Sequence, residues 1–279
     1  NPHNPAQVGR IPLTPDVVDG VVFWSKDPAP LLPYLDELDR MGHRYYFQFT
    51  LTPYGRQLEP GLRPKSEIFE TFLRLSRRIG RGRTLWRYDP ILLGTGWTVE
   101  RHERAFAEMC RRLAPFTDRV TVSFLDLYAG VWAADIRPPG ESEAAELAGF
   151  IGRTARGCGI RPVACCEKAE LAAYGIGRAG CIDRELLGRL CGSPLAVGPD
   201  RNQRPGCGCA ESVDIGAYRC CPNGCVYCYA NSGAGAQAVR RNAARHRPDS
   251  EMLLGARRPG DRVRERPARS GLSRQLRWE

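Results

Sequence analysis

The sequence predicts an α/β fold, an incomplete TIM-like barrel of βα units followed by a Cys-rich region that a metal orders. Two observations predict it. Short β-branched and aromatic runs alternate with amphipathic helical stretches, a pattern typical of βα units around a parallel sheet. After about residue 168 this pattern gives way to a stretch rich in Gly, Pro and Cys, which needs metal ligation to order it. An open α/β sheet is the alternative to the barrel.

The predicted elements follow one another in strict alternation. Between residues 65 and 79, apolar side chains recur at the three- and four-residue spacing of an amphipathic helix. Residues 171–175 and 184–190 favour short helices. The predicted strands are Val17–Trp24, Arg44–Leu51, Arg83–Tyr88, Arg119–Leu125 and Arg161–Cys165, and the longer helices are Ala29–Met41, Lys65–Ile79, Val99–Leu113 and Glu141–Arg156.

The chain of 279 residues divides into three predicted regions. Residues 1–168 form the βα body, residues 169–254 the Cys-rich cluster-binding region, and residues 255–279 a basic, disordered tail. The net charge is +10, and residues 240–279 hold 12 Arg against 5 acidic residues. Such a tail is usually solvated; phosphate binding is the alternative. No apolar run approaches the roughly 20 residues of a membrane helix, so no membrane partner is expected.

Polar side chains follow nearly every predicted strand. In parallel α/β folds the carboxyl ends of the strands form the rim of the active site. Helix capping, a solvated loop or an Arg87–Asp89 ion pair would explain the same residues without catalysis. The side chains expected to line a catalytic rim are Lys26, Gln48, Arg87, Asp89, Asp126 and Glu167.

Cysteine carries the strongest chemical signal. Of 12 Cys, 11 lie between residues 158 and 228, a clustering that indicates metal ligands in a reducing cytoplasm rather than disulfides. Cys221, Cys225 and Cys228 form a CxxxCxxC triad. Because full protein ligation of a 4Fe–4S cluster uses four Cys, three would leave one iron open for S-adenosylmethionine, whose reductive cleavage yields a 5′-deoxyadenosyl radical. Tyr227 is expected beside the cofactor.

Other metal assignments remain open. Cys225 and Cys228 are also the CxxC half of a zinc site, which either Cys207 and Cys209 or Cys220 and Cys221 could complete. A metal-free redox CxxC is a third reading. A separate set of four has the right number for an auxiliary 4Fe–4S cluster or a zinc ion: Cys165, Cys181, Cys207 and Cys209. Cys110 and Cys191 are expected to be core residues.

Several motifs resemble the prokaryotic domain-of-unknown-function family 1848. The similarity covers about residues 1–254. It resides in Val22–Pro28, Tyr45–Thr50, Trp86–Ile91, Ser123–Tyr128, Cys181–Asp183, Asn202–Cys209, Ser212–Tyr218 and Cys221–Asn231.

That family has no established substrate. The resemblance implies the cluster-ligand role for Cys221, Cys225 and Cys228, and the other set of four matches further Cys of the family pattern. The C-terminal Cys cluster is similar to one that radical S-adenosylmethionine domains carry near their start. A Ser-Arg-Arg-Thr-Asp-like motif that the family usually has is absent, so a first strand and part of the active site are expected to be missing. Asp27 stands where the family usually has Asn.

Three functions compete on this evidence. The leading one is a radical S-adenosylmethionine enzyme of unknown substrate, which would need a reductant such as flavodoxin or ferredoxin. The second is a zinc-stabilised module that binds nucleic acid through the basic tail, although Trp278 is the tail's only aromatic residue and a stacking platform needs several. The third is an iron–sulfur electron carrier, which would not need a βα body.

Overall fold

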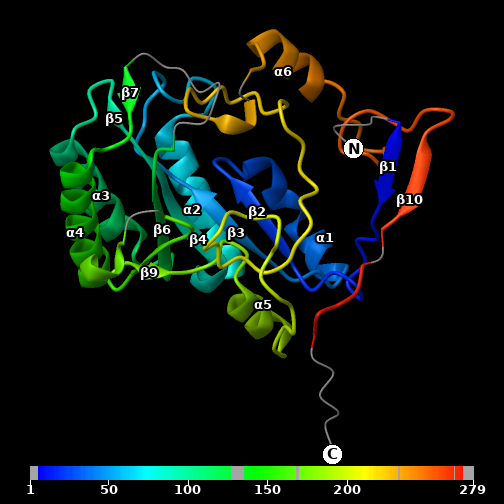
Figure 1. The fold of residues 1–279 in the computed structure, drawn as a ribbon, viewed down its shortest axis with the longest axis horizontal. Coiled ribbons are helices and arrows are strands. Elements are labelled where there is room, and N and C mark those ends of the chain that lie inside the picture. The colour runs from blue at the N-terminus through cyan, green and yellow to red at the C-terminus, as the bar shows by residue number, and fades with distance from the viewer. Residues whose placement is uncertain (1–5, 127–134, 168–169, 232, 267, 273–279) are drawn as a thin grey trace, which may run out of the picture.

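A six-stranded parallel sheet forms the centre of the computed structural model, which describes residues 6–126, 135–167, 170–231, 233–266 and 268–272 (Figure 1). Every strand pairs in parallel with its neighbours, in the order β2-β3-β4-β6-β8-β9. The strands are β2 (Val21–Ser25), β3 (Tyr45–Thr50), β4 (Thr84–Ile91), β6 (Arg119–Phe124), β8 (Arg161–Ala164) and β9 (Gly177–Arg178).

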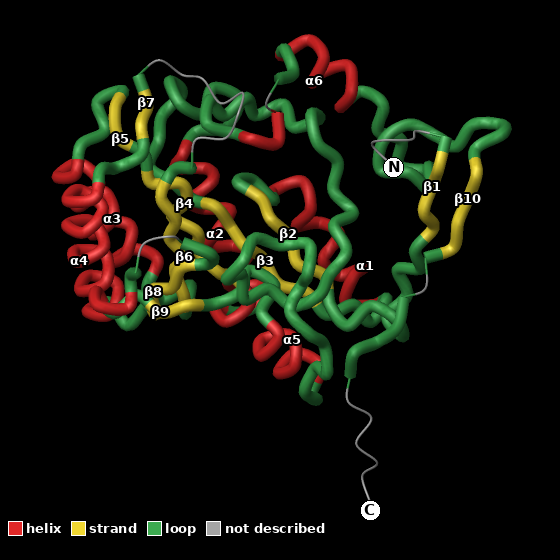
Figure 2. The backbone as a smooth tube through the Cα atoms, viewed as in Figure 1, coloured by secondary structure: helices red, strands yellow, loops and turns green. Residues whose placement is uncertain are grey.

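Helices α1 to α4 each lie between two strands of this sheet in the chain and pack on one of its faces (Figure 2). The longer ones are amphipathic and bury their apolar stripe against alternate strand residues such as Phe47, Trp86 and Val122. Their bounds are α1 (Leu35–Arg40, after the 3₁₀ turn Ala29–Tyr34), α2 (Lys65–Ile79), α3 (Val99–Leu113) and α4 (Glu141–Gly157), followed by α5 (Arg184–Cys191) and α6 (Ala236–Ala243). Short 3₁₀ turns occupy Arg81–Arg83, Ala172–Tyr174 and Tyr229–Asn231.

The α/β class and the parallel sheet are confirmed. Among the described residues β2 and β9 are the edge strands of an open sheet, so a TIM-like barrel is not confirmed and the open-sheet alternative describes what is observed. The first predicted strand begins later than expected, at Val21, because residues 15–17 form a turn. Two small sheets accompany the main one: β5 (Leu93–Gly94) pairs with β7 (Ile136–Arg137), and β1 (Gln7–Arg10) with β10 (Arg262–Glu265).

The opposite face of the sheet is unusually polar for a buried surface. Successive strand residues point to opposite faces, so Gln48, Arg87 and Arg119 lie on the face without α1–α4. They are 0%, 8% and 3% exposed. Helix α5 covers part of this face, where Leu186 and Leu187 pack on Tyr46. The Cys-rich segments provide further contacts on the same face.

The basic tail requires a correction. Residues 255–279 were expected to be disordered, yet Arg262–Glu265 form β10 and pair in parallel with Gln7–Arg10. The side chains of β10 are exposed, so backbone pairing and an ion pair between Arg10 and Glu265 account for this strand. Its sequence has no apolar pattern from which a strand could be predicted. Residues 273–279 of the tail, Trp278 included, lie outside the described residues. No described helix has the length and apolarity to cross a membrane.

Candidate metal centre

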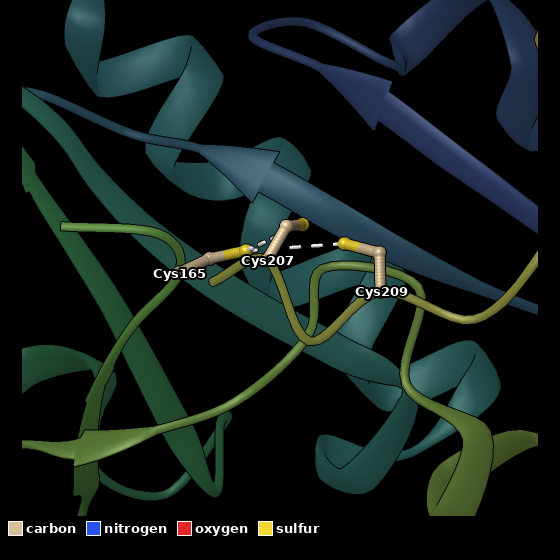
Figure 3. Close-up of side chains that lie close together, drawn as sticks. All are labelled: Cys165, Cys207 and Cys209. Carbon is tan, nitrogen blue, oxygen red and sulfur yellow. Dashed lines mark hydrogen bonds between the residues drawn. The ribbon is translucent and has the colours of Figure 1, made fainter. Parts of the chain in front are cut away.

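Three cysteine thiols meet at the carboxyl end of the parallel sheet (Figure 3). Cys165 directly follows β8, and Cys207 and Cys209 lie on a loop that approaches it. The Cys165 sulfur lies 4.0 Å from that of Cys207 and 3.8 Å from that of Cys209. Among the described residues this is the only group of three or more Cys, His, Asp or Glu whose ligand atoms all lie within 4.8 Å of one another. The arrangement suits a metal ion with a preference for soft ligands.

A fourth thiol, that of Cys181, belongs to a neighbouring segment, although its sulfur is not within 4.8 Å of all three. Its interactions with the thiols of Cys165 and Cys209 lower its pKa, and the charge of Arg87 adds to the effect. The Arg87 Nη1 donates a hydrogen bond of 2.9 Å to the Cys181 sulfur. The backbone N–H of Cys181 donates to the Cys209 sulfur at 3.2 Å.

The polar face of the sheet holds Cys181 in position. Tyr46 and Gln48, both on β3, donate hydrogen bonds of 2.6 and 2.8 Å to the Cys181 carbonyl. Arg119 on β6 forms a buried ion pair of 2.5 Å with Asp183. Asp183 also accepts from the backbone N–H groups of the first turn of α5, as an N-cap does. The strand residues therefore fix the segment that carries the fourth thiol.

The CxxxCxxC loop lies elsewhere along the same end of the sheet. It packs on the segment that follows β3: Val226 N–H donates to the Leu58 carbonyl at 3.0 Å, and Gly61 N–H to the Asn223 carbonyl at 2.9 Å. Gly224 has φ of +63°, a conformation that glycine adopts without strain. Burial is the largest cause that raises the pKa of Cys225 to about 12, and Lys26 opposes it.

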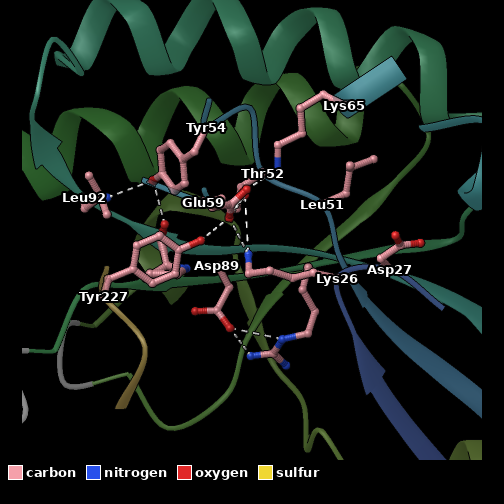
Figure 4. Close-up of polar contacts among 12 residues, drawn as sticks. Lys26, Asp27, Leu51, Thr52, Tyr54, Glu59, Lys65, Asp89, Leu92 and Tyr227 are labelled. Atoms are coloured by element: carbon pink, nitrogen blue, oxygen red, sulfur yellow. Dashed lines mark hydrogen bonds and ion pairs between the residues drawn. The ribbon is translucent and has the colours of Figure 1, made fainter. Parts of the chain in front are cut away.

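Glu59 is the centre of a polar cluster beside this loop (Figure 4). The Glu59 side chain is 0% exposed. It accepts from Lys26 Nζ at 2.8 Å, from Thr52 Oγ1 at 2.8 Å, and from Lys65 Nζ and the Tyr227 hydroxyl. Burial alone would raise the Glu59 pKa, but the charges of Lys26 and Lys65 outweigh it and hold the pKa below its usual value.

The structure separates the predicted rim residues into different roles. Lys26 joins the Glu59 cluster, whereas Gln48 and Arg87 contact Cys181. Arg87 also forms an ion pair of 2.5 Å with Asp89, as one alternative anticipated. Asp126 pairs with Arg204 at 2.7 Å, and Glu167 accepts from the Phe124 N–H at 3.2 Å with a pKa that burial raises.

The remaining cysteine predictions have mixed outcomes. Cys110 is fully buried in the core, as expected. Cys207 and Cys209 lie with Cys165, so they do not complete a zinc site with Cys225 and Cys228. Cys191 is only partly buried and its thiol donates to the Asp19 carbonyl at 3.2 Å, so its core assignment is wrong.

Glu59 and Lys65 are site residues that sequence reasoning missed. Glu59 sits in a Pro- and Gly-containing loop with no motif around it, and two of its partners, Lys26 and Tyr227, come from distant segments. No local signal could have identified it.

Comparison with known proteins identifies the family. The family model for a domain of unknown function (DUF1848) matches residues 1–230, so the chain belongs to that family. No curated protein and no solved structure matches the chain. The matched range includes both groups of cysteines, the four around Cys165 and the three of the CxxxCxxC loop.

Proposed function

We propose that this member of the DUF1848 family is an iron–sulfur enzyme that uses S-adenosylmethionine, with Cys221, Cys225 and Cys228 as ligands of a 4Fe–4S cluster. A cluster with three protein ligands has one open iron for the methionyl group, and reductive cleavage then supplies a 5′-deoxyadenosyl radical that removes hydrogen from a substrate. Flavodoxin or ferredoxin would be a suitable reductant.

The observation that carries the proposal is the position of the CxxxCxxC loop. It packs on Leu58 and Gly61, in the segment that leaves the carboxyl end of β3. Lys26, directly after β2, is close enough to influence the pKa of both Cys221 and Cys225. Active sites of parallel α/β folds lie at this end of the sheet.

The spacing of the three thiols is compatible with a cluster. Cys228 lies near enough to raise the pKa of both Cys221 and Cys225, but the three thiols are not among the groups whose ligand atoms all lie within 4.8 Å. Thiolates on different irons of a cube are held farther apart than thiolates that share one metal ion. Tyr227 lies between two of the three ligands in sequence, and its hydroxyl is fixed by Glu59.

The charge around the loop suits an anionic ligand group. Glu59 is the carboxylate to which both Lys26 and Lys65 are paired, so the cluster of these three side chains carries a net positive charge. The lysine side chains retain 16% and 29% exposure. Either ammonium group could bind a ligand carboxylate without leaving Glu59. We assign this recognition role to the lysines and no proton transfer to Glu59.

The test is an anaerobic reconstitution with iron and sulfide. We expect about four irons and four sulfides per chain at the loop, a reduced EPR signal that changes when S-adenosylmethionine is added, and 5′-deoxyadenosine after chemical reduction. Changing Cys221, Cys225 or Cys228 to Ala should abolish all three results.

Cys220→Ala is the matched control, because this neighbouring thiol only donates to the Ala217 carbonyl. It should leave the iron content and the EPR response unchanged. A loop that binds stoichiometric zinc and no iron would refute the proposal.

A further inference from the structure

The sulfur spacing of Cys165, Cys207 and Cys209 fits one metal ion rather than a cluster. Four thiolates at about 2.3 Å from a zinc ion form a tetrahedron with edges of about 3.8 Å. The Cys165 sulfur lies 3.8 and 4.0 Å from the sulfurs of Cys209 and Cys207. The CxxxCxxC thiols do not share this close spacing.

Cys181 supplies the fourth corner. Its backbone N–H donates to the Cys209 sulfur at 3.2 Å. Its own sulfur is not within 4.8 Å of all three other sulfurs, so it would have to approach them when the ion binds. With four protein thiolates the coordination is complete, which is typical of structural zinc sites, whereas catalytic zinc sites keep one position for water. We propose that Cys165, Cys181, Cys207 and Cys209 bind a single zinc ion in a closed tetrahedral site, separate from the CxxxCxxC loop.

Hydrogen-bond donors surround the four sulfurs as a metal-thiolate site requires. Zinc with four thiolates carries two negative charges, and burying them demands compensation. The backbone N–H groups of Cys181 and Ile182 donate to the Cys209 sulfur at 3.2 and 3.5 Å. The Arg87 guanidinium donates to the Cys181 sulfur, and Asp89 holds its other side. Arg87 is thus a positioning residue for the ligand.

The ion would fasten the covering segments to the sheet. Its ligands come from three places: the end of β8, the segment before α5 and the 207–209 loop. Between α5 and the CxxxCxxC loop the described chain contains no helix or strand longer than isolated bridges. Such a segment gains order from ligation more than from a core. The inference does not depend on the proposed enzyme function.

Zinc content of purified protein tests the proposal. The background is the variant with Cys221, Cys225 and Cys228 all changed to Ala, which removes the other candidate site. We expect one zinc and no iron per chain in this background. Adding Cys165→Ser or Cys209→Ser should lower zinc at least tenfold. Cys166→Ser is the matched control and should retain zinc, because the Cys166 thiol points to the Pro205 carbonyl.

Cobalt exchange covers the case in which the Ser variants fail to fold. In the triple-Ala background, Co²⁺ should give the charge-transfer and ligand-field bands of a tetrahedral site with four thiolates. Arg87→Gln should keep the stoichiometry but release the metal to a chelator faster. A background variant without zinc, or one with iron and sulfide, would overturn the inference. Zinc in that background together with a wild-type chain that binds no iron would reject only the proposed enzyme function.

Discussion

Glu59→Gln tests the polar cluster that supports the CxxxCxxC loop. The amide keeps one oxygen, which can still accept from Lys26 and Thr52. In the wild-type chain both of these donors lie 2.8 Å from Oε1 of Glu59. The other oxygen, Oε2, faces Lys65. An amide NH₂ group there would place a donor against a donor. Both lysines would also lose the one carboxylate to which they are paired.

The cost follows from the burial of these groups. Removing one partner of a buried ion pair typically costs about 3 to 5 kcal/mol. The lysine side chains keep 16% and 29% exposure, so water relieves part of the penalty and the lower figure applies. A loss of about 3 kcal/mol should lower the melting temperature by about 6 to 12 °C in a domain of this size.

Thermal unfolding followed by circular dichroism measures this loss on samples of equal metal content. Glu67→Gln is the control, because the Glu67 side chain is 53% exposed in its pair with Arg63 and such a pair is worth at most about 1 kcal/mol. Lys65→Met added to Glu59→Gln should recover part of the loss by removing an unpaired cation. A Glu59→Gln protein with the same melting temperature as the Glu67→Gln control would refute the reasoning.

Three further changes probe other parts of the fold. His102 is buried between Tyr88 and the Leu92 carbonyl, and burial lowers its pKa to about 4 from 6.5. The folded state therefore binds fewer protons than the unfolded state, and lowering the pH from 7.5 to 5 should reduce the free energy of unfolding by about 2 kcal/mol. His102→Gln should abolish this loss, so equal pH dependence of the two proteins in urea unfolding would contradict the argument. Phe106→Ala should cost about 3 to 5 kcal/mol in the same assay, because its ring is fully buried and stacks on Trp86; a cost below 1 kcal/mol would show that the core collapses around it. Asp183→Asn keeps the helix cap but leaves Arg119 buried without its counter-charge. It should therefore destabilise the fold nearly as much as Asp183→Ala, by about 3 to 5 kcal/mol; a much smaller loss for Asp183→Asn would mean that the cap contributes more than the ion pair.

Local patterns predicted the elements of the sheet and not its closure. Helices α2 and α3 run over the predicted residues, because their apolar stripes have a clear helical period. Closure depends on pairing between distant edge strands, and β9 has only two residues, Gly177 and Arg178. Strand β10 has exposed side chains and pairs through its backbone, so no hydrophobic pattern could predict it.

The same limit applies to the candidate sites. Cysteine spacing made the CxxxCxxC triad and the second set of four visible in the sequence. Gln48 and Arg87 were predicted as rim residues because polar side chains follow strands, but their contact with Cys181 depends on which segment covers that face. Glu59 became visible only once folding brought Lys26, Lys65 and Tyr227 around it.

X-ray absorption at the iron and zinc edges of one reconstituted sample tests the central claim, that the chain holds an iron–sulfur cluster and a separate zinc ion. The account predicts an iron spectrum with iron–iron scattering, and a zinc spectrum with only sulfur neighbours at about 2.3 Å. The iron signal alone should disappear when Cys221, Cys225 and Cys228 are changed to Ala. Zinc at both sites, or iron–iron scattering that survives in this variant, would contradict the account.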